Sequence, residues 1–323
     1  MNCRKNLFGT EITEIGLGCW QLGDAWGEVN DTDAQAILRA SFDAGVRFFD
    51  TAAAYGGGKS ERRIADFKAS LTEAERRELF IATKITRAEA SAAHIRASAD
   101  QSSANLQMQP VDLLQLHCWS MEMMQQPGIW DALRQLKTDG RIRGFGASVE
   151  SMEEARYCMA QEGLTTLQII FNIYRQHPRD EIFAEAREKG VGLIVRVPLA
   201  SGLLSGKFGH DTVFGEQDHR NFNRDGQRFH VGETFGGLPF EKGTALTDKL
   251  KRLLPSEPGM AQLALRWILD HPEVMTIIPG ATSVAQAESN AAASELPPLP
   301  DSTHAQLAEF YAAEVSPHVR GQY

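Results

Sequence analysis

Apolar residues along the chain follow two alternating spacings. Short apolar runs, which are typical of buried strands, alternate with segments in which apolar residues recur every three or four positions, as on one face of a helix. In residues 31–46, for example, apolar side chains follow the helical spacing, and a short apolar run at 47–50 comes directly after them. This pattern predicts eight strands, at 15–20, 47–50, 79–84, 111–117, 142–148, 166–172, 191–198 and 274–279. It also predicts helices at 31–44, 60–67, 88–106, 129–138, 151–161, 179–189 and 260–269.

The regular order of strands and helices determines the expected architecture. Strands separated by helices pair in parallel through right-handed crossovers, and eight such units close into a cylinder. We therefore predict an α/β fold in which residues 1–323 form a single (β/α)8 TIM-barrel domain. Residues 4–15, which turn at Gly9, predict an N-terminal β-hairpin, and residues 302–315 predict a C-terminal helix. Residues 206–247 lack an apolar period, and their length and position predict a long lid loop over the barrel mouth after the seventh strand.

An open, doubly wound sheet is the competing fold, and it normally carries the dinucleotide-binding pattern GxGxxG after its first strand. The two sequences nearest to this pattern begin at Gly16 and Gly144, and both lack the third glycine. The sequence GKS at 58–60 resembles the end of a P-loop, but Ala53 stands where the first glycine of that motif belongs. Neither kind of nucleotide site is therefore indicated.

The composition of the chain argues against some classes of binding partner. Lys and Arg number 33 against 42 Asp and Glu, a net charge of −9, which argues against nucleic acid as a partner. The four cysteines show no CxxC spacing, and no run approaches the roughly 18 apolar residues of a membrane-spanning helix. We expect a cytoplasmic protein with reduced thiols that acts on a small molecule and binds neither nucleic acid nor membrane. Its oligomeric state is not indicated.

Four ionisable residues lie at or just after the ends of neighbouring predicted strands, namely Asp50, Tyr55, Lys84 and His117. Each has an ordinary alternative, since Lys84 can be a salt-bridge partner and His117 a hydrogen-bonded core residue. The carboxyl ends of barrel strands meet at one rim, so the four residues are expected to converge. A nearby cation lowers the pKa of a phenol, a carboxylate can hold that cation, and a histidine can bind a substrate oxygen. The group is therefore interpreted as a site for carbonyl reduction with Tyr55 as general acid.

Nine motifs in order along the chain resemble those of the aldo-keto reductase family. They are IGLGCW at 15–20, GVRFFDTAAAY at 45–55, GKSE at 58–61, IATK at 81–84, VDLLQLH at 111–117, GRIRGFGAS at 140–148, LQIIFN at 167–172, PLASGLLSGK at 198–207 and IPGA at 278–281. The resemblance implies a barrel enzyme that reduces aldehydes or ketones to alcohols, or catalyses the reverse, with hydride from an NAD(P) nicotinamide. It also implies that the four residues are the family's catalytic tetrad, with Tyr55 as the proton donor.

The same resemblance implies a cofactor site. Ser148, Gln168 and Asn172 match positions near the nicotinamide carboxamide, and Val149 stands where the family usually has Asn. Arg196 stands where many members place an aromatic ring against the nicotinamide, so it could stack in the same way or pair with a carboxylate. The other positions that the resemblance assigns to the cofactor are Gly18, Cys19, Trp20, Asp50, Val197, Pro198, Leu199, Ser201, Leu203, Ser205, Gly206, Lys207, Gly280, Thr282, Gln286 and Asn290.

The adenosine end of that site differs from the family pattern. Members that select NADP commonly place Lys or Arg after the last strand to bind the 2′-phosphate, but no Lys or Arg occurs between Trp267 and Val319. A 2′-phosphate would have to rely on the amides of a helix N-terminus or on side chains elsewhere: Thr282, Ser283, Arg220 or Arg224. The family favours NADP, and this sequence predicts that NAD is accepted as well.

The sequence also indicates which residues surround the substrate, and it leaves two alternative functions open. Tyr55 and His117 are expected at the reacting carbonyl, and the walls are expected to come from Trp20, Trp26, Trp119 and residues 208–240. One alternative is a nicotinamide-cofactor-sensing regulatory protein of the channel-associated type, a kind of relative that keeps the tetrad. The other is a metal-dependent barrel hydrolase that uses His117 and Asp50, but the chain lacks HxH and HExxH spacings. The sequence does not indicate which carbonyl compound is the substrate.

Overall fold

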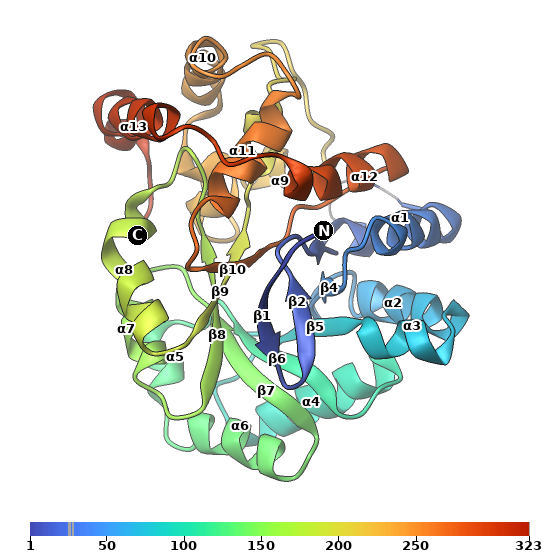
Figure 1. Cartoon of the computed structure of the whole chain (residues 1–323). Coiled ribbons are helices and arrows are strands. Elements are labelled where there is room, and N and C mark those ends of the chain that lie inside the picture. The colour runs from blue at the N-terminus through green and yellow to red at the C-terminus, as the bar shows by residue number, and fades with distance from the viewer. Residues whose placement is uncertain (25–26, 28, 323) are drawn as a thin grey trace.

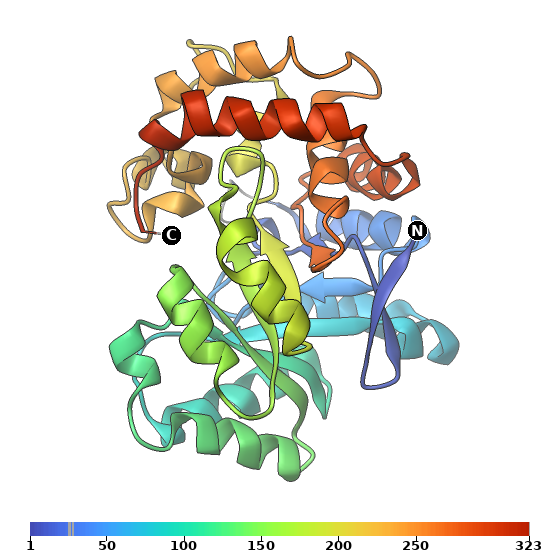
Figure 2. The same ribbon diagram turned by 60° about the vertical axis from the view of Figure 1, so that its left-hand side comes forward.

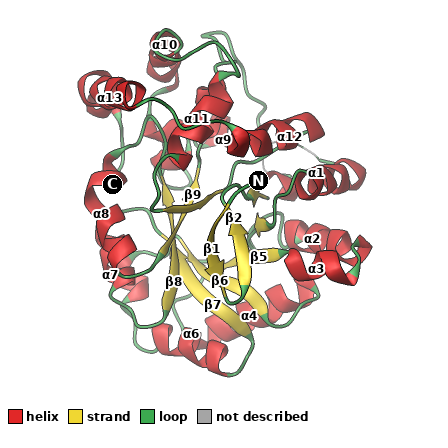
Figure 3. Cartoon of the chain, viewed as in Figure 1, coloured by secondary structure: helices red, strands yellow, loops and turns green. Residues whose placement is uncertain are grey.

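The computed structural model describes residues 1–24, 27 and 29–322 of the chain. Within these residues, eight parallel strands form a cylinder that helices surround (Figures 1 and 3). Each strand overlaps one predicted range, so the predicted (β/α)8 barrel is confirmed. The strands are β3 (Leu17–Gly18), β4 (Phe48–Asp50), β5 (Phe80–Ile85), β6 (Val111–His117), β7 (Ile142–Ser148), β8 (Leu164–Ile170), β9 (Gly192–Arg196) and β10 (Val274–Ile277).

The first and last strands of the sheet, β3 and β10, meet and close the cylinder. Parallel bridges join Ile15 to Ile277 and Gly18 to Gly280. The backbones approach so closely here that a Cβ atom on Gly18 would lie 2.6 Å from the carbonyl oxygen of Ile278. A glycine at this position therefore allows the barrel to close.

Replacing Gly18 by alanine should lower the free energy of unfolding by about 1–3 kcal/mol, because the added methyl group forces the two closing strands apart. Urea denaturation followed by tryptophan fluorescence measures this loss. Gly209→Ala is the matched control, since a Cβ atom on Gly209 would meet no atom within 4 Å. Equal stability of the two variants would contradict the role of Gly18 in closure.

The predicted N-terminal hairpin is confirmed and consists of β1 (Cys3–Leu7) and β2 (Thr10–Thr13), drawn in dark blue in Figure 1. Leu7 and Ile12 of the hairpin belong to one apolar cluster with residues of the barrel interior, which are Phe48, Phe80, Ala82, Leu113, Ile194, Met275 and Ile278. The hairpin thus covers the amino-terminal end of the barrel. Polar interior residues occur nearer the carboxyl end of the strands.

The predicted helices are also present, with ends that differ from the predicted ends by a few residues. They are α1 (Asp31–Asp43), α2 (Lys59–Ser70), α4 (Ala92–Leu106), α6 (Ile129–Thr138), α7 (Met152–Met159), α8 (His177–Glu188), α11 (Met260–Leu269) and the C-terminal α13 (Asp301–Phe310). The apolar pattern did not predict α3 (Glu73–Glu78), α5 (Met121–Met124) or α12 (Val284–Ala292). No residue of α3 is buried, and a capping box of Thr72 and Glu75 begins it, so it has no apolar face to detect. Among the described helices, none combines the length and the apolar character that crossing a membrane requires.

The segment at 206–247 follows β9 as expected, but it is not a continuous loop. It contains α9 (His219–Phe222), short 3-10 turns and the first residues of α10 (Phe240–Leu250). Its aromatic residues pack as a compact cluster and not along one helix face, which explains the missing apolar period. The rings of Phe214, Phe235 and Phe240 have centroids 5.0 to 5.7 Å apart. Figure 2 shows α10 on the same side of the molecule as the C-terminal helix in red, and Lys249 of α10 pairs with Glu314.

Candidate active site

The four predicted site residues meet at the carboxyl end of the barrel. Asp50 ends β4, Lys84 lies one residue before the end of β5, and His117 ends β6. Tyr55 lies in the turn that follows β4. Nζ of Lys84 is 3.4 Å from the hydroxyl oxygen of Tyr55, and the rings of Tyr55 and His117 contact edge to face with centroids 5.7 Å apart. The fold therefore gathers residues that are up to 67 positions apart in the sequence (117 − 50 = 67).

Acceptors around the ammonium group hold Lys84 in place. The side chain has no exposed surface, and Nζ donates to Oδ1 of Asp50 and, at 2.8 Å, to the carbonyl oxygen of Thr51. Oδ2 of Asp50 accepts from Nε2 of Gln115 at 3.2 Å and from Nε2 of Gln168 at 2.8 Å. A buried ion pair is tolerated when its remaining lone pairs are hydrogen-bonded in this way. The carboxylate thus fixes the cation beside Tyr55.

Burial is the largest single cause of the pKa shifts in the site, and neighbouring charges add to it or oppose it. Burial raises the pKa of Tyr55, and the opposing effect of Lys84 is smaller. The expectation that the phenol is unusually acidic is therefore wrong in its net direction, although the contribution of Lys84 has the expected sign. Burial lowers the pKa of Lys84, but Asp50 and Tyr55 outweigh it and the net shift is upward. Burial, with the charges of Lys84 and Arg196, lowers the pKa of His117 well below its usual range. At neutral pH Tyr55 is protonated, Lys84 is cationic and His117 is neutral.

Aromatic residues from the segment after β9 cover this end of the barrel. The ring of Trp20 has its centroid 6.2 Å from that of Tyr55 and 4.6 Å from that of His219 in α9. Phe229, from the same segment as His219, also contacts Trp20, with centroids 5.9 Å apart. The segment therefore reaches the mouth of the barrel, beside Tyr55.

The other two predicted tryptophans of the substrate wall have different positions. Trp119 has no exposed surface, and its indole N–H donates to the carbonyl oxygens of Ile85 and Thr86, each at 3.2 Å. Trp119 thus packs in the core and does not reach the open side of the site in this structure, which corrects its expected place in the wall. Trp26 lies outside the described residues.

The residues expected around the nicotinamide carboxamide lie at the same end of the barrel. Ser148 ends β7, Gln168 lies near the end of β8, and Asn172 follows two residues after β8. Gln168 donates to Asp50, and Nδ2 of Asn172 donates to the carbonyl oxygen of Val197 at 2.9 Å. Both amides are therefore held in one orientation before any ligand binds.

Arg196 ends β9 and pairs with a carboxylate, which is the second of the two alternatives for this residue. Its guanidinium contacts Glu233 and donates to the carbonyl oxygen of Val149 at 2.8 Å. Cys118 lies beside it, with Sγ 3.9 Å from Nη2. The pair thus links a barrel strand to the segment over the mouth.

Three residues of metal-ligating type lie around the same arginine. In the described part of the chain, Cys118, Glu150 and Glu233 are the one group of three such residues whose ligand atoms lie within 4.8 Å of one another. The guanidinium of Arg196 already places a positive charge against this group. Neither Asp50 nor His117 belongs to it, so the ligands that the hydrolase alternative requires are not gathered there.

The turn that follows β9 has a strained backbone. Val197, Ala200 and Ser201 adopt left-handed φ angles of 53°, 48° and 53°. Such conformations cost on the order of 1–3 kcal/mol each and are concentrated in binding loops, where the surrounding structure maintains them. Oγ of Ser201 donates to the carbonyl oxygen of Glu233 at 2.8 Å, which helps to hold the turn. The segment from Leu199 to Lys207, which the family resemblance assigns to the cofactor pyrophosphate, lies in this turn and directly after it.

The predicted contacts at the adenosine end lie between β10 and α12 and within α12. Oε1 of Gln286 accepts from the backbone N–H of Thr282 at 2.8 Å and from its hydroxyl at 3.0 Å, and Nδ2 of Asn290 donates to the carbonyl oxygen of Gly280 at 3.2 Å. Arg220 and Arg224 are paired with Asp218 and Glu241. The two arginines that sequence analysis offered for a 2′-phosphate are thus engaged with carboxylates.

Gln115 was not among the predicted site residues, although it contacts Asp50 directly. The available signal was its position, because it is an amide in the otherwise apolar run LLQL, two residues before His117. Residues two apart on a strand face the same side, so Gln115 had to face the same interior as His117. An isolated amide in a buried strand requires a hydrogen-bond partner, and that requirement pointed to the site.

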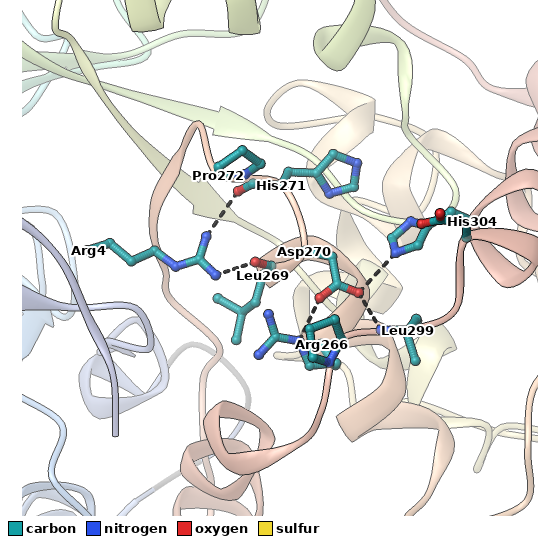
Figure 4. Close-up of a pocket in the computed structure, with 10 residues that line it drawn as sticks. Arg4, Arg266, Leu269, Asp270, His271, Pro272, Leu299 and His304 are labelled. Atoms are coloured by element: carbon teal, nitrogen blue, oxygen red, sulfur yellow. Dashed lines mark hydrogen bonds and ion pairs between the residues drawn. The ribbon is translucent and has the colours of Figure 1, made fainter.

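A separate cavity has a volume of about 610 Å³, and Figure 4 shows residues that line it. Its polar groups bond to one another, since Asp270 accepts from Nε of Arg266 and from the backbone N–H of Leu299, both at 2.9 Å, and pairs with His304. The four predicted catalytic residues do not line it. The lining residues are Arg4, Arg266, Leu269, Asp270, His271, Pro272, Pro298, Leu299, Asp301 and His304.

Comparisons with known proteins agree with the fold. A family model described as the aldo/keto reductase family matches residues 14–312. The aldo-keto reductase YhdN of Bacillus subtilis is 28% identical over 292 residues, which cover 87% of this chain and 85% of that protein. The structure of the glycerol dehydrogenase AKR11B4 from Gluconobacter oxydans has a TM-score of 0.80 at 23% identity and covers 99% of this chain and 98% of that one. The structure of an aldo-keto reductase from Klebsiella pneumoniae in complex with NADPH has a TM-score of 0.68 at 23% identity, with 93% and 92% covered.

Proposed function

The chain belongs to the aldo/keto reductase family of NAD(P)-dependent oxidoreductases, and from this premise we propose that it reduces an aldehyde or ketone to an alcohol, or catalyses the reverse, with Tyr55 as the proton donor. The contact between Lys84 and Tyr55, 3.4 Å from Nζ to the hydroxyl oxygen, is the observation that carries the proposal. A phenol alone is a poor acid near neutral pH, with a pKa of about 10. A fixed cation at this distance favours the phenolate that forms when the proton leaves.

Each residue of the site has a separate task in this proposal. His117 is neutral and donates one N–H to the carbonyl oxygen of the substrate, which polarises the carbonyl group. Tyr55 donates its proton to the same oxygen as negative charge develops there. Lys84 stabilises the resulting phenolate, and Asp50 holds Lys84 in place. The nicotinamide cofactor, when bound, supplies the hydride.

The residues present fit such a cofactor. The turn from Val197 to Gly202 keeps a strained, left-handed backbone, and it lies where the pyrophosphate is expected. Strain of this kind is typical of binding loops. The orientation of Gln168 and Asn172 is fixed by Asp50 and Val197, so their amides form a preorganised edge for the carboxamide. A catalytic function is also favoured over the regulatory alternative, because the relatives above are named as reductases or dehydrogenases.

We propose a relaxed preference between NADPH and NADH. A dianionic 2′-phosphate is normally neutralised by Lys or Arg, and the stretch from β10 through α12 contains neither. Arg220 and Arg224 are engaged with carboxylates. This stretch therefore offers a 2′-phosphate no positively charged side chain, and NADH carries no 2′-phosphate that would need one.

Steady-state reduction of a panel of aldehydes, ketones and sugars, followed by nicotinamide absorbance, tests the function and the preference together. We expect reduction with both cofactors, with kcat/KM values that agree within about tenfold, a difference of 1.4 kcal/mol. Thr282→Arg should raise kcat/KM for NADPH by about tenfold and leave NADH unchanged, since Thr282 is exposed and the new cation meets only the 2′-phosphate. Thr282→Gln is the matched uncharged control. Turnover with neither cofactor would refute the function, and a thousandfold preference for NADPH in the native protein would refute the relaxed preference.

A further inference from the structure

The barrel interior changes from apolar to polar along β6. Leu113 belongs to the apolar cluster under the hairpin, and Gln115 is the next residue of the strand that faces the same side. Gln115 has no exposed surface. Burying an amide at such a place costs free energy unless its hydrogen-bonding groups are matched. The partners of Gln115 therefore indicate what the residue does.

Gln115 is bonded to Asp50 and lies beside Gln168. Its Nε2 donates to Oδ2 of Asp50 at 3.2 Å, and Nε2 of Gln168 donates to the same oxygen at 2.8 Å. Nε2 of Gln168 is also 3.5 Å from Oε1 of Gln115. Both N–H groups of the Gln168 amide are thus directed into the barrel. Within the described residues, the side-chain hydrogen bonds of Gln168 all use Nε2, which leaves Oε1 as the acceptor on the cofactor side.

A glycine lies on the neighbouring strand at the level of Gln115. Gly146 of β7 lies in register with Gln115 of β6 on one side and with Thr166 of β8 on the other. A Cβ atom on Gly146 would lie 2.2 Å from the hydroxyl oxygen of Thr166. The strand β7 thus contributes no side chain at this level, and the space is taken by the Thr166 hydroxyl, while the amides of Gln115 and Gln168 contact each other from β6 and β8.

We propose that Gln115 is a positioning residue that acts through both of its neighbours. It orients the Gln168 amide so that Oε1 accepts a hydrogen bond from the carboxamide N–H of the nicotinamide, and it takes up part of the negative charge of Asp50. The inference rests on the proposed function, because it concerns the cofactor and the proton donor of that reaction.

Two effects follow from removing the Gln115 amide. Gln168 keeps its bond to Asp50 but loses its second acceptor, so its amide is held less firmly in the orientation that turns Oε1 towards the carboxamide. Asp50 loses one donor, so more of its negative charge acts on Lys84. The field of Lys84 at Tyr55 then becomes weaker, which makes the phenolate less favourable and raises the pKa of Tyr55.

Gln115→Met, which keeps the length of the side chain, tests the proposal. The Kd values for NADP⁺ and for NAD⁺, measured separately by quenching of tryptophan fluorescence, should rise by about 3- to 10-fold, as expected for one lost hydrogen bond. In the pH profile of kcat/KM for reduction, the high-pH limb that reports deprotonation of Tyr55 should move upward by roughly half a unit.

Thr166→Val is the matched control. Thr166 lies on the same strand as Gln168, is fully buried, and has a hydroxyl group without a hydrogen-bond partner among the described residues. Its removal should leave both Kd values and the pH profile as in the native protein. Agreement between Gln115→Met and Thr166→Val in both measurements would overturn the positioning role. If the native protein reduces no carbonyl compound, the proposed function fails, and the Kd values then decide on Gln115 alone.

Gln115→Glu decides the question if Gln115→Met does not fold. Glutamate keeps the shape of glutamine, and its protonated form can still donate to Asp50. Reduction by this variant should approach the native rate at low pH and fall as that proton is lost, a limb that the native profile lacks. A Gln115→Glu profile parallel to the native one would overturn the proposal.

Discussion

Replacing Tyr55 by phenylalanine should lower kcat for carbonyl reduction by about 10² to 10⁴, the contribution of one positioned proton donor. The change removes the hydroxyl group that lies 3.4 Å from Nζ of Lys84 and keeps the ring that packs against Trp20 and His117. The pocket should therefore retain its shape, and the Kd for the cofactor should stay within about twofold, less than 0.5 kcal/mol. Single-turnover reduction and fluorescence titration measure the two quantities.

Tyr174→Phe is the matched control for the loss of a buried hydroxyl group. The Tyr174 hydroxyl bonds to Oγ1 of Thr247 at 2.8 Å, away from the four site residues. This variant should lose about 1 kcal/mol of stability and keep its activity. Unchanged turnover in Tyr55→Phe, or an equal loss of turnover in both variants, would rule out Tyr55 as the acid.

The fold was predictable because the barrel repeats one simple pattern eight times. The strand β5 is buried along its whole length and β6 in all but its last residue, and the helices between strands carry one apolar face, so both periods appear in the sequence. Elements without an apolar face gave no such signal. The helix α3 buries no residue, and its capping box and ion pairs of Glu75 and Glu78 with two arginines hold it. In α10, three of the six buried positions are Gly or Thr, and its first residue, Phe240, packs in an aromatic cluster with residues of the preceding segment.

The positions of the site residues were predictable for a different reason. Asp50, Lys84 and His117 occur where strands end, and parallel strands bring their carboxyl ends together. The pKa of Tyr55 was not predictable in this way. The direction of its shift depends on the balance between burial, which raises the pKa, and the nearby charge of Lys84, which lowers it. The spacing of residues in the sequence determines neither the depth of burial nor the distance to Lys84. Packing in three dimensions also decided that Trp119 lies in the core and that Arg196 pairs with Glu233.

Burial raises the pKa of Tyr55 more than Lys84 lowers it, and this balance matters for the mechanism. An acid with a raised pKa stays fully protonated at neutral pH, so Tyr55 is ready to donate in every molecule of the enzyme. The cost is a less favourable phenolate, and Lys84 offsets that cost only while its ammonium group remains charged. The raised pKa of Lys84, which Asp50 and Tyr55 produce against the effect of burial, ensures that charge. Asp50 thus acts on the proton donor through Lys84, without touching it.

Replacing Lys84 by methionine should therefore remove both activity and stability. Without the cation the pKa of Tyr55 rises further, and kcat for reduction should fall by about 10² to 10⁴. Asp50 remains buried without its ion-pair partner, which should lower the free energy of unfolding by about 3–5 kcal/mol. Steady-state reduction and urea denaturation measure the two losses on the same protein.

The double variant Lys84→Met with Asp50→Asn separates the two effects. It removes both buried charges, and the asparagine still offers an oxygen to the amides of Gln115 and Gln168. Stability should return to within about 1–2 kcal/mol of the native value, because no unpaired charge remains in the barrel. Activity should stay as low as in Lys84→Met, because the phenolate still has no cation beside it. Recovery of reduction together with stability would show that Lys84 only maintains the fold, and the assignment of the charged Lys84 as the group that makes Tyr55 a proton donor would then be wrong.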